Sequence, residues 1–170
     1  CIGKSFLKSQ PSWSLSDNHI PLTSATDILG VTVETNLKYN SHITSRIQKC
    51  NRSIYRMSSV GMSYPGLDST VKAHLWNVIG CPTLSYGMEC ITLSNTDMNN
   101  LKRAQGNIVK NVMGTGKRSH HSNLFKALNI KPIDQIIEKN MMGLFHRIFK
   151  VDTPVMHLQS VSGQNACIQE

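Results

Sequence analysis

The chain lacks most features that mark secreted, membrane or disordered proteins. Its five cysteines are odd in number and scattered, whereas a disulfide-stapled domain carries a denser, even set, so we expect reduced thiols that mostly fill the core. No apolar run approaches the ~18–20 residues that span a bilayer, and no basic-then-apolar signal peptide opens the chain. Charged residues make up only 16% and hydrophobic residues 39% of the 170 residues, which excludes a polar disordered tail and permits a packed core.

Catalytic and metal-binding patterns are also missing. None of the ten Asp and Glu residues is adjacent to another, whereas two-metal phosphoryl transfer needs at least two carboxylates that converge on the ions. No Gly-x-Ser-x-Gly elbow frames a serine. The pair His120-His121 with Cys81 and Cys90 matches no zinc-ligand spacing. We therefore predict no catalytic residue, no metal site and no cofactor in this chain.

Positive charge, in contrast, is abundant and concentrated. The net charge is +8, and residues 37–150 hold sixteen of the eighteen Lys and Arg side chains against five acids. Residues 151–170 have two acids and no Lys or Arg. A field of this sign attracts polyanions, either nucleic acid or an anionic membrane surface.

The first 36 residues predict strands and turns. Ser5–Leu7 is a short strand candidate, and Pro11–Pro21 is polar and turn-rich. Ile28–Val33 is apolar and β-branched and predicts one strand, with a bulge or a close backbone approach at Gly30. Because two isolated strands are only marginally stable, these pieces indicate the remainder of a larger sheet. The unpaired edge of Ile28–Val33 would favour self-association.

Helical periodicity dominates from Asn40 onward. The apolar spacing predicts helices over about 40–60, 68–80, 97–113, 122–128 and 132–150, with Pro82 ending or kinking the second. Residues 83–93 fit a helical or an extended conformation, and 151–170 have no period and are predicted to be loose. The residues expected to face inward in the second and last helices are Val71, Leu75, Val78 and Ile79, and Ile133, Ile136, Ile137, Leu144 and Ile148. The predicted fold is mainly α, a helical bundle with a few N-terminal β-strands.

A basic face on the first helix is the best local functional signal. Arg46, Lys49, Arg52 and Arg56 recur at three- and four-residue spacing, which lets a helix follow one phosphate strand. No acid in the helix pairs with them. A solvated helix face is the alternative reading, and this pattern alone does not decide between the two.

Five further basic residues extend the predicted nucleic-acid site. They lie on the outer side of the third helix and in the loop Gly114–Ser119: Lys102, Arg103, Lys110, Lys117 and Arg118. The loop is similar to a phosphate-binding loop, but Asn111 stands where that motif needs glycine, and Arg118 stands where it needs Ser or Thr. A helix stop is therefore the better prediction for Gly114.

Four motifs in a fixed order resemble one protein family. They are Leu29-Gly30-Val31, Asn36–Ile43, Tyr86-Gly87-Met88-Glu89 and Asn129–Ile133, and together they resemble the end of the polymerase region in reverse transcriptases of non-LTR (LINE-type) retrotransposons. The resemblance implies a palm-edge β segment over 1–36, a helical thumb and post-thumb region over 37–150, and a tail over 151–170. It also implies a partner, RNA or DNA as a template–primer duplex held through its phosphates, and no membrane.

The same resemblance bears on activity. The catalytic aspartates of that family, which bind Mg²⁺, lie upstream of these motifs, and this chain begins at Cys1 without an initiator Met. We therefore expect a fragment of an RNA-directed DNA polymerase that is inactive alone but still binds nucleic acid without sequence preference. A nuclear or cytoplasmic location follows if the chain is expressed. The alternative is a small helical protein–protein interaction module with no nucleic-acid role.

Overall fold

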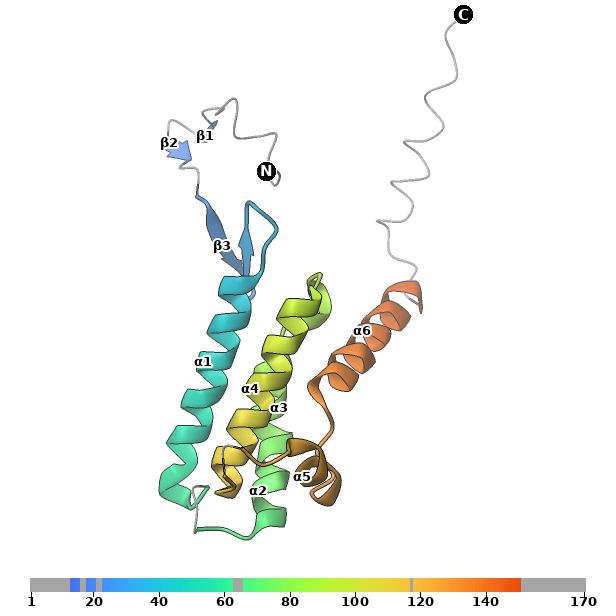
Figure 1. The fold of residues 1–170 in the computed structure, drawn as a ribbon. Helices are drawn as coiled ribbons and strands as arrows, with labels where there is room; N and C mark the ends of the chain where they lie inside the picture. The colour runs from blue at the N-terminus through green and yellow to red at the C-terminus, as the bar shows by residue number, and fades with distance from the viewer. Residues whose placement is uncertain (1–12, 16–17, 21–22, 63–65, 117, 151–170) are drawn as a thin grey trace, which may run out of the picture.

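The computed structural model describes residues 13–15, 18–20, 23–62, 66–116 and 118–150. The described part is a bundle of helices preceded by two short β-hairpins, so the predicted mainly α fold is confirmed (Figure 1). The predicted strand Ser5–Leu7 and the predicted loose tail 151–170 lie outside the described residues.

Both hairpins lie ahead of the helices. β1 (Trp13–Leu15) pairs with β2 (Asn18–Ile20) in antiparallel register, inside the stretch that was predicted to be turn-rich. β3 (Ala25–Ile28) pairs with β4 (Val31–Glu34), also antiparallel, with Ile28 opposite Val31. The described β structure is therefore local, and each strand pairs with its neighbour along the chain.

The prediction of one strand from Ile28 to Val33 is wrong, because the chain reverses in its middle. Leu29 and Gly30 both have positive φ angles, +50° and +77°. A two-residue loop with both φ values positive is a type I′ turn, whose twist matches that of paired strands. Gly30 therefore marks a tight turn, and the apolar residues on either side of it pair with each other.

α1 (Asn40–Arg56) has apolar residues at helical spacing on one side, and of these Ile43, Cys50 and Ile54 are buried. Neither Asn40 nor Ser41 caps it, although both residue types favour that position; the N-cap is Tyr39, without a side-chain cap, and the Ser41 hydroxyl donates to Glu34. The helix tightens into a 3-10 turn, η2 (Met57–Val60), and ends at Gly61 in the left-handed conformation that glycine favours.

α2 (Ser69–Leu75), a π-helical turn η3 (Trp76–Gly80) and α3 (Cys81–Ser85) follow one another without a break. Of the two outcomes predicted for Pro82, the end of a helix near residue 80 is wrong, because the helix continues as far as Ser85. Pro82 lies in the first turn of α3, directly after the wide π turn. A proline ring normally clashes with the carbonyl four residues earlier. The wider turn displaces those carbonyls, and the Thr83 hydroxyl donates to the carbonyl of Ile79 at 2.6 Å.

The inward face of this segment also differs from the prediction. Val71 and Val78 are exposed, and Leu75 and Ile79 are half-buried. The buried residues are Lys72, Ala73, Trp76 and Gly80. The bulkiest apolar side chain determines the face: Trp76 is fully buried, and a Cβ on Gly80 would lie only 2.4 Å from its ring.

The remaining helices are η4 (Met88–Cys90), α4 (Asn95–Met113), α5 (His121–Ala127) and α6 (Ile133–Lys150). α4 begins with a capping box, in which Ser94 and Asp97 exchange side-chain and backbone hydrogen bonds, and it ends at Gly114 with φ of +66°. The helix stop predicted at Gly114 is therefore confirmed. Buried Gln105 in α4 then fixes the start of α6. Its side-chain oxygen accepts a hydrogen bond from the amide of Ile133 at 2.8 Å, and its side-chain nitrogen donates one to the carbonyl of Lys131 at 2.9 Å.

α6 packs on the bundle only through its first half. Ile133 and Ile137 are buried, but the predicted inward residue Ile148 is exposed and Leu144 is only half-buried. Figure 1 shows the later turns of α6 pointing away from α4. The apolar period therefore continues beyond the part of the helix that has a partner.

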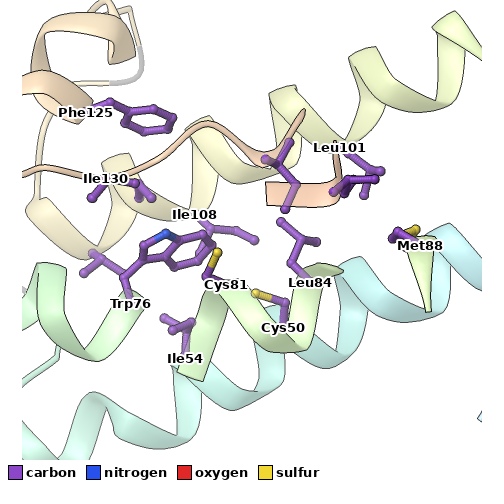
Figure 2. Close-up of a cluster of buried hydrophobic side chains, with 14 of the residues drawn as sticks. Cys50, Ile54, Trp76, Cys81, Leu84, Met88, Leu101, Ile108, Phe125 and Ile130 are labelled. Carbon is purple, nitrogen blue, oxygen red and sulfur yellow. The ribbon is translucent and has the colours of Figure 1, made fainter. Parts of the chain in front are cut away.

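The core lies where α1, α3 and α4 meet, with the α5–α6 connection on its other side. Figure 2 shows Trp76 between Ile54 and Ile108, with Cys50 and Cys81 nearby. Burial raises the pKa of Cys50 to about 12 and that of Cys81 to about 11. These two thiols are free and buried, as predicted for core filler, whereas Cys90 is exposed.

Candidate nucleic-acid interface

Arg46 does not belong to an exposed basic face, so this part of the sequence prediction is wrong. Only 8% of the residue is exposed. Its guanidinium donates to the carbonyl of Gly30 in the β3–β4 turn and lies over the ring of Tyr86, 4.3 Å from the centroid. Arg46 therefore fastens the hairpin to α1 and α3.

His42, one turn earlier in α1, supports the same junction. Its Nδ1 accepts the amide proton of Thr32, and its Nε2 lies 3.3 Å from the carbonyl of Tyr86. This pattern fits a neutral ring with the proton on Nε2. Burial lowers the pKa of His42, and the positive charge of Arg46 acts in the same direction. His42 is therefore a hydrogen-bonded structural residue.

Two motifs that are far apart in the sequence meet at this junction. The Tyr86 hydroxyl donates to the carbonyl of Leu29 at 2.9 Å. Gly87 has φ of +76°, and a Cβ there would approach Val31 Cγ2 to 2.7 Å. The Leu-Gly-Val and Tyr-Gly stretches are thus in direct contact and have a structural role.

The exposed basic face of α1 consists of Lys49, Arg52 and Arg56, and we call it the basic face from here on. All three side chains are exposed. In the part of the chain that the structure describes, none of them has an ion-pair partner. Unpaired cations at helical spacing can contact successive phosphates.

The other predicted cations divide into three groups. Lys102 is paired with Asp134 at 2.7 Å, and Lys110 is half-buried and has an interaction of its own. Arg103 and Arg118 are exposed, whereas Lys117 lies outside the described residues. Of these five, Arg103 and Arg118 are the described cations best placed to meet a polyanion.

α1 and α4 lie side by side and run in the same direction (Figure 1). Between them is a groove with two cavities, of about 640 Å³ toward their N-terminal ends and about 470 Å³ toward their C-terminal ends. Both cavities are lined in part by Asn51, Ile108 and Asn111, so they adjoin each other. Arg103 lines the first cavity, and Arg52 and Arg56 line the second.

The groove contains residues that the sequence prediction missed. Its lining includes five asparagines, which present amide donors and acceptors: Asn40, Asn51, Asn100, Asn107 and Asn111. Tyr55 is 80% exposed and lines the second cavity between Arg52 and Arg56. The sequence contains a signal for these asparagines. Asparagine is unfavourable inside helices, so its recurrence in α1 and α4 indicates a role other than helix formation.

Comparison with protein-family models, curated proteins and solved structures found no match to this chain. Within the described residues, no helix is both long and apolar enough to cross a lipid bilayer. The functional proposal therefore depends on the basic face, the groove and the motifs themselves.

Proposed function

We propose that this chain is the C-terminal part of the polymerase region of a non-LTR retrotransposon reverse transcriptase, and that it binds RNA/DNA duplexes without sequence preference. The order and spacing of the motifs support the family. The basic face supports the binding. The parent family is an RNA-directed DNA polymerase that uses Mg²⁺, and the chain alone is proposed to be inactive in synthesis.

The observation that carries the binding proposal is the position of Lys49, Arg52 and Arg56. They are exposed and follow one another at three- and four-residue spacing along α1, whose apolar side is buried in the core. Among the described residues, no acid lies within ion-pair distance of them. Their positive field is therefore available to a partner, and phosphate contacts by such cations release counterions and make binding strongly dependent on salt.

The test is fluorescence-anisotropy titration of a labelled RNA–DNA hybrid across a range of salt concentrations. The variant changes Lys49, Arg52 and Arg56 to Gln and keeps Arg46, which the fold requires. If each cation contacts a phosphate, the salt slope falls by up to about 0.9 per contact, the value for B-form DNA.

The matched control changes Lys126, Lys131 and Lys139 to Gln, three exposed lysines outside α1. It removes the same charge from the α5–α6 side. Equal losses in the two variants would show attraction by net charge alone. A hybrid that a folded chain does not bind, or binds with an unchanged constant as salt rises, would contradict the proposal.

A second function is favoured by the unpacked half of α6. Met142, Phe145, Ile148 and Phe149 are exposed there, and the rings of Phe145 and Phe149 stack with 6.4 Å between their centroids. This face fits a helical interaction module that binds another protein. Sedimentation velocity over a concentration series, compared with a Phe145→Ser/Phe149→Ser variant, tests whether this face associates.

This alternative also includes self-association through a strand edge, but the edge differs from the one that the sequence predicted. Since Ile28–Val33 contains the Leu29-Gly30 turn and is divided between β3 and β4, the available edges are the outer edges of that hairpin, and every residue of β3 is exposed. Oligomers that persist in the Phe145→Ser/Phe149→Ser variant would direct attention to that edge.

A further inference from the structure

The C-terminal cavity of the α1–α4 groove combines three kinds of surface. Its floor is apolar and comes from buried side chains: Ile54, Met62, Ile108 and Val112. Tyr55 provides an aromatic wall that is 80% exposed. Asn51 and Asn111 add amide groups at the junction with the rest of the groove. The volume of about 470 Å³ lies within the usual range for small-ligand pockets.

These surfaces match the chemistry of a nucleobase. A base has two apolar faces, which pack against an apolar floor or stack on an aromatic ring. Its edge carries donors and acceptors, and an asparagine amide offers both. Because such amides can pair with the edge of any base, the cavity would accept bases with little sequence preference.

The cations next to the cavity fit the rest of a nucleotide. Arg52 and Arg56 precede and follow Tyr55 in α1, and both line the same cavity. A base stacked on Tyr55 would therefore have its phosphates within the field of two arginines. A duplex keeps its bases paired and stacked internally, so only an unpaired base can enter such a cavity.

We propose that this cavity binds one unpaired base of a nucleic-acid strand, stacked on Tyr55, while Arg52 and Arg56 contact its phosphates. This inference rests on the proposed nucleic-acid binding and adds a specificity to it. The chain prefers a duplex with a single-stranded overhang to a blunt duplex. The groove continues past Asn51 and Asn111 toward Arg103, which gives neighbouring nucleotides a path along α1 and α4.

The test compares three labelled RNA–DNA hybrids by anisotropy with the full chain. One is blunt, one has a short single-stranded overhang, and one has the same overhang built from abasic nucleotides. We expect the overhang to bind about tenfold more tightly than the blunt hybrid, and the abasic overhang to lose most of that gain, because base–aromatic stacking contributes on this scale.

Variants at Tyr55 assign the gain to the cavity. Tyr55→Ala should abolish the preference for the overhang over the blunt hybrid, whereas Tyr55→Phe should retain this preference. Phe149→Ala is the matched control, because Phe149 is an aromatic residue that is 73% exposed and lies in α6, outside the cavity lining.

The outcomes separate this inference from the function on which it rests. Equal affinity for the normal and abasic overhangs, or an overhang preference that survives in Tyr55→Ala, would overturn the base site while duplex binding stands. No binding to any of the three hybrids by a folded chain would overturn the duplex-binding proposal and the base site together.

Discussion

Replacing Arg46 tests whether this residue stabilises the fold or contacts nucleic acid. Its sequence pattern places it with the basic face, whereas the structure buries it between the β3–β4 turn and Tyr86. Arg46→Met keeps a long side chain that fills similar space, and it removes the charge and the hydrogen-bond donors. We expect the protein to become less stable while its affinity for an RNA–DNA hybrid changes little.

The size of the effect follows from two contacts. A hydrogen bond from a charged donor contributes about 1.5–3 kcal/mol, and a cation–π contact contributes about 0.5–2 kcal/mol. The lower ends apply, because Gly30 is exposed and water can replace the lost donor, and because Arg46 Nε has no partner among the described residues. The expected loss is therefore about 2 kcal/mol. In a chain of this size, that lowers the melting temperature by about 4–8 °C.

Urea unfolding followed by circular dichroism measures the loss, and anisotropy on the same samples measures binding. Lys49→Met is the matched control, since Lys49 is exposed on the same helix and such a surface change stays within about 0.5 kcal/mol. An unchanged midpoint for Arg46→Met combined with weakened hybrid binding would refute the reasoning and return Arg46 to the basic face.

Three further predictions concern buried contacts. Gly87→Ala should cost about 2 kcal/mol or more, because it combines a left-handed φ with a Cβ 2.7 Å from Val31 Cγ2; thermal unfolding measures it, and a neutral result would contradict the junction. Gln105→Met should cost about 2–3 kcal/mol and speed hydrogen exchange at the Ile133 amide, which loses its acceptor; unchanged exchange would oppose this. The pKa of His42 in the folded state is lowered from its ordinary value of 6.5, so the unfolded state takes up a proton first as the pH falls. The free energy of unfolding should therefore decrease as the pH is lowered through 6.5, until His42 in the folded state is protonated as well. Urea midpoints across that range, compared with His42→Gln, check whether this slope belongs to His42.

The long helices were predictable from the sequence because local signals agree in them. α1 and α4 have apolar residues at helical spacing, and Gly61 and Gly114 end these helices in the conformation that glycine favours. Asp68 is a further local signal, because it caps α2 and its carboxylate accepts a hydrogen bond from the amide of Thr70 at 2.9 Å. In each case, residues within a few positions of one another determine the structure.

The predictions that failed depend on contacts between distant residues. Nothing near Arg46 in the sequence shows that the carbonyl of Gly30 and the ring of Tyr86 will surround it. Helical spacing alone also gave Ile148 the same inward face as Ile133, although α6 has no partner at its far end among the described residues. Likewise, the π turn before Pro82 requires a widened helix that no propensity rule indicates.

The junction between the hairpin and α3 shows that the structural role of the sequence motifs is separate from the question of which residues bind nucleic acid. Leu29-Gly30-Val31 and Tyr86-Gly87 form one contact, in which Tyr86 holds the turn and Gly87 leaves room for Val31. These residues are occupied in packing, so the motifs concern how the hairpin is fixed to the helices. The proposed nucleic-acid binding therefore uses other side chains, and the exposed candidates are the basic face, Arg103, Arg118 and Tyr55. Hence a variant that disrupts the junction tests the fold, whereas variants at these exposed residues test nucleic-acid binding.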